Sequence, residues 1–227
     1  MENKTINIQM VAKIADALKD LLPKMVFVGG ATISLYTDDT AADEIRPTSD
    51  IDMTVQLTGY SAWVELQERL TKLEFHPDTE RQAMCGYLYQ GISVDIMPSE
   101  DGPIGKSNSW YKPGFKHLTE VTTGGQVIKI LSAPYFLATK FEAFNDRGGD
   151  YRTSHDFEDI IYVIDNRTTI VEEILSADDL VKTFLIRELS KVTSSQYAEE
   201  FIRAHIHPII VNERYPLLLE KLKKIVG

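Results

Sequence analysis

The chain has 227 residues, of which 43% are hydrophobic and 26% are charged, and its formal net charge is −10. These proportions are typical of a globular protein with one larger domain or two small ones. A single cysteine excludes a disulfide framework and a cysteine zinc site. The polar N-terminus does not resemble a signal peptide, and no stretch is apolar enough to span a membrane. We therefore expect a cytoplasmic protein with no membrane contact, whose overall charge repels nucleic acid.

Apolar residues recur at helical spacing between residues 8 and 22, which predicts an amphipathic helix ending at Pro23. A strand over residues 25–28 follows, then a glycine pair and a short helix. Glycines after a buried strand let a phosphate approach the backbone closely, and the N-terminus of the next helix points to the same place. We therefore expect a phosphate cradle. Its expected members are Gly29, Gly30 and a hydroxyl from Thr32 or Ser34.

The polar stretch over residues 37–49 reads as a loop, and a strand with two acids follows it. Asp50 and Asp52 are two residues apart, so both side chains lie on one face of that strand. Two carboxylates this close repel each other, and a divalent cation between them removes the conflict. Oxygen-only ligation suits Mg²⁺. Arg46, just before the acids, either contacts phosphate or pairs with a neighbouring acid of its own loop, Asp43 or Glu44.

Further strands and one helix complete an α/β pattern up to residue 131. A stripe of large apolar residues predicts a helix over residues 60–73. Two pairs of β-prone runs are each separated by a short turn, which predicts two hairpins. The paired runs are residues 83–89 with 92–97, and residues 118–122 with 126–131.

After residue 132 the pattern becomes helical, and no further strand is expected. The predicted fold class is therefore α/β (α+β): a mixed-sheet domain over residues 1–131, followed by a helical-bundle domain over residues 132–227. The expected helices begin at Ala133 and continue over residues 155–164, 171–175, 177–192, 196–204 and 216–226.

One lysine of the first of these helices has aromatic neighbours. Lys140 lies among Phe136, Phe141 and Phe144, so an inward-facing amine would be partly desolvated and would need an anionic partner, for which a triphosphate is one candidate. Two acids of the following helix, Asp156 and Asp159, are three residues apart and share a helix face. A solvated helix surface is the alternative for these residues.

The ordered motifs resemble a known superfamily. A Gly-Gly turn followed by Asp50-Ile51-Asp52, and then by an acid inside the apolar strand around Asp95, is similar to the signature of polymerase-β-like nucleotidyltransferases. The resemblance implies transfer of a nucleoside monophosphate from an NTP, with two Mg²⁺ ions held by Asp50, Asp52 and Asp95. It also implies that Asp95 accepts the proton of the attacking hydroxyl.

With Lys140, an arginine and a final His-Asp-Phe run added, the order of motifs over most of residues 25–165 resembles the AbiEii family, the toxin halves of type IV toxin–antitoxin systems. This resemblance implies that Lys140 neutralises triphosphate charge and that Asp156 orients Lys140 or contacts the nucleotide. The family usually has Lys-Asp-aromatic where this chain has His155-Asp156-Phe157, which leaves the role of His155 open. Some members modify tRNA 3′ ends, so tRNA or another RNA and a cognate antitoxin are the implied partners.

Two other functions remain open. The enzyme could nucleotidylate a small molecule, as aminoglycoside nucleotidyltransferases do, or a protein; alternatively, the fold could be catalytically silent and bind only nucleotide or a partner. The intact acids oppose a silent fold. Basic and aromatic residues interleaved between Asp101 and His117 favour RNA, because such residues together suit single strands. They are Lys106, Lys112, Lys116, Trp110, Tyr111 and Phe115, with Lys129 further along the chain.

Overall fold

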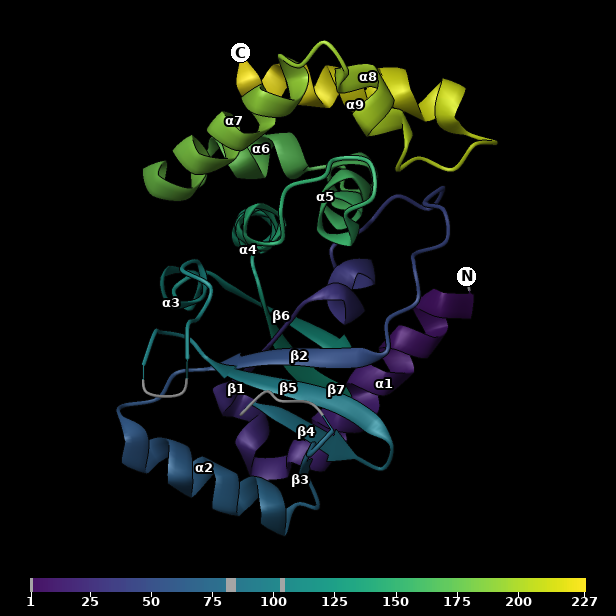
Figure 1. Ribbon diagram of the computed structural model, residues 1–227. Coiled ribbons are helices and arrows are strands. Elements are labelled where there is room, and N and C mark those ends of the chain that lie inside the picture. The colour runs from purple at the N-terminus through teal and green to yellow at the C-terminus, as the bar shows by residue number, and fades with distance from the viewer. Residues whose placement is uncertain (1, 81–84, 103–104) are drawn as a thin grey trace. The chain divides into compact units, whose positions relative to one another are not determined.

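The computed structural model describes residues 2–80, 85–102 and 105–227. It divides into two compact units, and each is described by itself (Figure 1). The first unit comprises Met1–Leu35 and Glu44–Ser132, and the second comprises Tyr36–Asp43 and Ala133–Gly227. A short segment from the middle of the N-terminal half thus belongs, by its contacts, to the second unit.

The first unit is built on a seven-stranded sheet with the order β3-β4-β5-β2-β1-β7-β6. The sheet is mixed, as expected, because β1 pairs antiparallel with β2 and parallel with β7, while β2 pairs parallel with β5. The strands are β1 (Met25–Val28), β2 (Asp50–Val55), β3 (His76–Pro77), β4 (Gly86–Tyr89), β5 (Ile92–Pro98), β6 (Leu118–Thr123) and β7 (Gln126–Leu131).

Both predicted hairpins are present, and their turns explain why the sequence identifies them. Gln90 and Gly91 connect β4 to β5 with φ values of 47° and 81°, and Gly124 and Gly125 connect β6 to β7 with φ values of 55° and 81°. Two successive residues at positive φ match the twist of the strands that they join. The predicted strand over residues 83–89 lies partly outside the described residues, and β4 begins at Gly86.

The helices of the first unit differ from the prediction in detail. The predicted N-terminal helix divides into α1 (Glu2–Leu18) and a 3₁₀ helix, η1 (Lys19–Lys24), because Lys19 takes a φ of 49° that an α-helix does not allow. A second 3₁₀ helix, η2 (Gly30–Leu35), follows the glycine pair. The helix α2 (Tyr60–Lys72) is as predicted, whereas α3 (Tyr111–Gly114) and β3 are too short to give a periodic signal.

The second unit is a bundle of helices, as the sequence predicts. Its centre consists of fully buried aromatic and aliphatic side chains, including Phe141, Phe157, Leu185 and Leu218. The helices are α4 (Ala133–Asp146), α5 (His155–Asn166), α6 (Ile170–Leu175), α7 (Asp179–Thr193), α8 (Ala198–Arg203) and α9 (Val211–Val226).

The last helix begins five residues before the predicted start at Pro216. A proline lacks a backbone N–H and its ring clashes with the carbonyl four residues earlier, so a helix normally does not extend to the N-terminal side of a proline by more than its first turn. Here Arg214 anchors the additional turn, because its guanidinium donates hydrogen bonds to Asp39 Oδ2 at 2.6 Å and to Asp165 Oδ2 at 2.9 Å. Tertiary contacts therefore outweigh the local preference.

The same arginine fixes the segment Tyr36–Asp43 on the bundle. Backbone N–H groups of Asp38 and Asp39 donate to Asn166 O, and the Asp38 carboxylate accepts from Thr168 N and Thr168 Oγ1. Tyr162 donates its hydroxyl to Asp43 O at 2.7 Å, and burial raises the pKa of that phenol to about 12. The first part of the connection between η2 and β2, Tyr36–Asp43, thus belongs to the helical unit. No helix in the described ranges is long and apolar enough to cross a membrane.

The β6–β7 turn provides a matched test of packing in the first unit. A methyl group at Gly124 would collide with the Ala12 side chain of α1, whereas a methyl group at Gly125 would meet open space. Gly125→Ala should cost about 1–2 kcal/mol, the penalty for an L-residue at positive φ. Gly124→Ala should cost about 1–3 kcal/mol more, because it also overpacks the contact with α1. Urea unfolding of both variants measures the difference, and equal losses would contradict the packing of α1 on this turn.

Candidate active site

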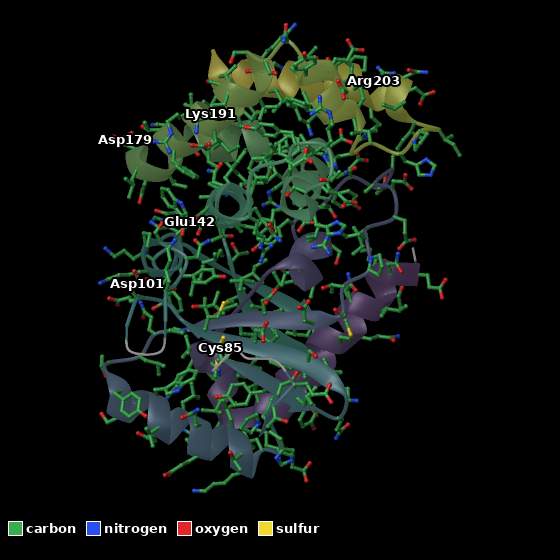
Figure 2. All side chains as sticks on the ribbon, viewed as in Figure 1. Cys85, Asp101, Glu142, Asp179, Lys191 and Arg203 are labelled. Atoms are coloured by element: carbon green, nitrogen blue, oxygen red, sulfur yellow. The ribbon has the colours of Figure 1, made fainter. Side chains whose placement is uncertain are left out.

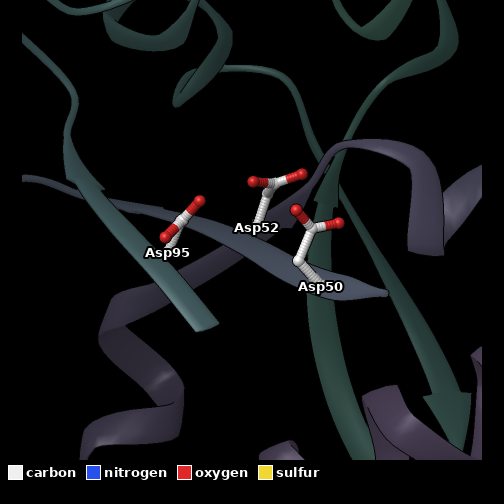
Figure 3. A group of neighbouring side chains, drawn as sticks. All are labelled: Asp50, Asp52 and Asp95. Carbon is white, nitrogen blue, oxygen red and sulfur yellow. The ribbon is translucent and has the colours of Figure 1, made fainter. Parts of the chain in front are cut away.

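Three aspartates meet on one face of the sheet. The parallel pairing of β2 with β5 places Asp52 opposite Asp95 and Asp50 opposite Ser93. Paired residues of neighbouring strands point to the same side, so the three carboxylates face one another (Figure 3). One oxygen from each side chain lies within 4.8 Å of the others, and all three residues are half-buried. The arrangement expected of Asp50, Asp52 and Asp95 is therefore present.

This group could hold a divalent cation. All three donors are carboxylate oxygens, which suits Mg²⁺ or Mn²⁺ better than metals that prefer nitrogen or sulfur. The half-buried position leaves room for solvent or substrate oxygens to complete an octahedral shell. The donor set therefore fits a hard divalent cation, the class to which the Mg²⁺ expected from the sequence belongs.

The glycine turn lies against these acids. Val28, the last residue of β1, pairs with Asp52, so the next residue along the chain comes up beside that carboxylate. A methyl group at Gly29 would overlap the Asp52 carboxylate, and the φ of 73° at Gly29 also favours glycine. A methyl group at Gly30 would lie 2.6 Å from Arg46 Nη2. The glycines are required because acidic and basic side chains occupy the space beside them.

Two predicted phosphate ligands point elsewhere. Thr32 is fully buried, and its hydroxyl donates to Gly29 O at 2.9 Å, which closes the turn. Ser34 is also buried. Their side chains lie inside the fold, whereas the Arg46 guanidinium lies beside the turn at Gly30. The helix behind the turn, η2, is a six-residue 3₁₀ helix and adds little dipole.

Residues that the sequence analysis missed hold the loop before the acids. Asn3 Nδ2 donates to Ile45 O at 3.0 Å, and the backbone N–H of Lys4 donates to Glu44 Oε1 at 3.2 Å. Asn7, which is completely buried in α1, donates to Arg46 O at 3.5 Å. The sequence does contain one indication of this contact, because Asn7 is a polar residue on the buried face of an amphipathic helix and must have a hydrogen-bond partner. The sequence does not identify that partner, since the loop lies about forty residues away along the chain.

A thiol lies in the same region of the first unit, where Figure 2 labels Cys85. Burial raises the pKa of this thiol, and the negative charges of Asp95 and Asp52 raise it further. Cys85 therefore stays protonated at neutral pH, which does not favour a role as a nucleophile.

In the second unit, Lys140 has protein partners. It lies on α4 and is 7% exposed, and its Nζ is 2.6 Å from Asp159 Oδ2 and 3.2 Å from Asp156 Oδ1. Arg147 Nη1 also pairs with Asp156 at 2.6 Å. Asp156 and Asp159 are 3% and 1% exposed, so the alternative of a solvated helix surface is wrong for both. The anion expected beside Lys140 is thus supplied by these carboxylates, whereas His155 is exposed and pairs with Glu158.

The basic and aromatic loop of the first unit differs from the prediction. Trp110 and Tyr111 are each 7% exposed, so their rings belong to the core and are unavailable for stacking on bases. Lys106, Lys112 and Lys116 are exposed, and Lys112 Nζ forms an ion pair with Glu100 Oε2 at 2.7 Å. The third predicted aromatic side chain, Phe115, is half-buried. The loop therefore offers positive charge without the two larger aromatic platforms expected at Trp110 and Tyr111; residues 103–104 lie outside the described ranges.

Comparison with known proteins identifies the fold and the family. The family model described as "Nucleotidyl transferase AbiEii toxin, Type IV TA system" matches residues 14–221. The crystal structure of an antigenic nucleotidyltransferase-like protein from Paracoccidioides brasiliensis is similar, with a TM-score of 0.52 and 19% identity over 90% of this chain and 95% of that chain. At this identity the likeness supports the fold. A search of curated proteins found no match.

The buried charges of the second unit generate a stability prediction. Lys140→Met should destabilise the protein by about 3–5 kcal/mol, because it removes the ammonium group that faces two buried carboxylates. Lys140→Met combined with Asp159→Asn should lose clearly less, since one of the two negative charges is removed as well. Chemical denaturation measures both variants. Arg147→Met is the comparison and should cost less than Lys140→Met, because the Arg147 side chain is exposed, water can replace it, and Asp156 keeps Lys140 as a partner. A double variant no more stable than the single one would contradict this account.

Proposed function

Because the chain belongs to the AbiEii family of nucleotidyl transferase toxins of type IV toxin–antitoxin systems, we propose that it transfers a nucleoside monophosphate from an NTP to RNA in a Mg²⁺-dependent reaction. The observation that carries this proposal is the convergence of Asp50, Asp52 and Asp95, with one oxygen of each within 4.8 Å of the others. The three acids come from two paired strands and lie beside a glycine turn, in the order of motifs that the family resemblance implies.

The proposed reaction is a substitution at the α-phosphorus. A hydroxyl oxygen of the acceptor forms a bond to this phosphorus, the bond to the β-phosphate oxygen breaks, and pyrophosphate leaves. Asp95 accepts the proton of the attacking hydroxyl. Mg²⁺ held by the three carboxylates would supply stabilisation of the charge that develops on the phosphoryl oxygens. The backbone of Gly29 and Gly30 and the Arg46 guanidinium would hold the remaining phosphates. The glycines leave the backbone N–H groups accessible, and the guanidinium can form charge-assisted hydrogen bonds to phosphate oxygens.

The proposal keeps roles for two residues of the second unit. By the family resemblance alone, Lys140 would neutralise triphosphate charge in addition to facing Asp156 and Asp159, and Asp156, 3.2 Å from Lys140 Nζ, would orient the amine. This pairing supports the positioning role of Asp156. Because the same pairing stabilises the fold, a Lys140 variant must be shown to be folded before a loss of activity is attributed to nucleotide binding.

RNA, in particular a tRNA 3′ end, is the proposed acceptor because the family resemblance implies it and exposed lysines are present on the loop beyond β5. With Trp110 and Tyr111 buried, the attraction would be electrostatic and would not involve stacking on these rings. A cognate antitoxin is the proposed protein partner on the same family grounds.

A small molecule or a protein is the second candidate acceptor. The net charge of −10 repels a polyanion. The burial of the two rings removes part of the expected single-strand site. Incubation of the protein with each labelled NTP, Mg²⁺ and total RNA separates these candidates, because only the first predicts labelled RNA.

Removal of one acid tests the metal centre. Asp50→Asn or Asp52→Asn should lower the rate of transfer on the order of 10³-fold, because the metal supplies several kcal/mol of charge stabilisation and each 1.36 kcal/mol is tenfold. Without metal, the melting temperature should stay level or rise, since the repulsion is relieved. Addition of EDTA to the wild type should abolish transfer, and excess Mg²⁺ should restore it. Full activity in either variant would overturn the assignment.

The acceptor has its own test. Simultaneous charge reversal at Lys106, Lys112 and Lys116 to Glu should reduce labelling of RNA at least tenfold and make the remaining reaction less sensitive to salt. Nucleotide binding, measured separately by titration calorimetry, should change little.

A matched control keeps the total charge change equal. Lys13, Lys24 and Lys72 are exposed elsewhere on the first unit, and their reversal to Glu should leave RNA labelling close to that of the wild type. If both triple variants label RNA equally, the loop does not bind the acceptor.

A further inference from the structure

Thr48 contacts the acidic group and has no role in the reaction described above. Its hydroxyl Oγ1 donates to Asp50 Oδ1 at 2.9 Å and lies 3.4 Å from Asp50 O. Thr48 is half-buried in the loop that leads into β2. The hydroxyl therefore meets a carboxylate of the proposed metal centre from within the loop.

The backbone position of Asp50 differs from that of Asp52. Strand β1 ends opposite Asp52, so Asp52 lies between β1 and β5, whereas β5 is the only described strand that pairs with Asp50. As the first residue of β2, Asp50 also has the loop directly on its N-terminal side. The loop that carries Thr48 is therefore placed to contact the side chain of Asp50.

A carboxylate that binds a metal has to be held in one orientation. A hydrogen bond to one oxygen fixes the plane of the carboxylate and thereby the direction of its remaining lone pairs. It also offsets part of the repulsion that pushes Asp50 away from Asp52 and Asp95. Both effects favour the geometry that a cation needs before the cation arrives.

We propose that Thr48 is a positioning residue of the metal centre, which orients the Asp50 carboxylate through its hydroxyl and so sets the affinity for the divalent cation. This proposal rests on the proposed metal-dependent transfer. The hydroxyl neither touches the substrate nor binds the metal; it acts only through Asp50.

Mn²⁺ binding to the full-length protein without nucleotide, measured by titration calorimetry, tests the proposal independently of activity. Thr48→Val retains the shape of the side chain and removes the hydroxyl, and it should weaken Mn²⁺ binding about 10- to 100-fold. Thr48→Ser restores a hydroxyl and should bind Mn²⁺ within a few-fold of the wild type. A purely structural role would lower the melting temperature of Thr48→Val but leave the Mn²⁺ affinity unchanged.

Thr71→Val makes the same chemical change at a hydroxyl that donates to Gln67 O within α2, and it should leave Mn²⁺ binding unchanged. If Thr48→Val binds Mn²⁺ as tightly as the wild type while Asp50→Asn does not bind it, the metal centre stands and the role of Thr48 is wrong. If the wild type binds no Mn²⁺ at these acids, the metal centre fails and the role of Thr48 fails with it.

Discussion

Electrostatic repulsion among three carboxylates is the constraint around which the first unit is arranged. Two unit charges about 4 Å apart near a protein surface repel by about 4 kcal/mol, and the pairing of β2 with β5 holds Asp50, Asp52 and Asp95 at comparable separations. The strand backbone cannot relax this geometry without losing its hydrogen bonds. The glycine turn lies beside the Asp52 carboxylate, and the Thr48 hydroxyl donates to Asp50, so neighbouring groups approach these carboxylates without adding a bulky side chain to the space between them.

The acids of the second unit, unlike a group of neighbouring carboxylates, are paired with basic side chains. Asp156 and Asp159 are almost fully buried, and Lys140 and Arg147 supply two positive charges against their two negative ones. This group is balanced by the protein itself, and burial requires that balance. The three acids of the sheet differ from these in burial: they are half-buried, and one oxygen of each lies within 4.8 Å of the others. Their carboxylates therefore remain partly open to solvent, whereas those of Asp156 and Asp159 are enclosed with their basic partners.

The sequence was informative where the signal was local. Two-residue turns with glycine identified both hairpins, and the two-residue spacing of Asp50 and Asp52 identified their common face. Contacts between distant segments had no such signal: nothing near Arg46 in sequence indicates that its guanidinium lies against Gly30 or that Asn7 of α1 holds its carbonyl. The same limit explains the error at Trp110 and Tyr111. Their spacing among lysines resembles a nucleic-acid surface, and only the tertiary structure shows both rings to be buried.

The connection between η2 and β2 affects how substitutions in the helical unit should be interpreted. Residues 36–43 join the glycine turn to the strand that carries Asp50 and Asp52, yet Asn166, Thr168 and Arg214 fix them on the bundle. A change at Arg214 would therefore release a segment that the chain connects to the glycine turn through η2 and to the acidic strand through residues 44–49. Loss of transfer after such a change would not make Arg214 a catalytic residue, because the same loss follows from a displaced connection. Only substitutions that alter metal or nucleotide binding without altering this anchor report on the chemistry.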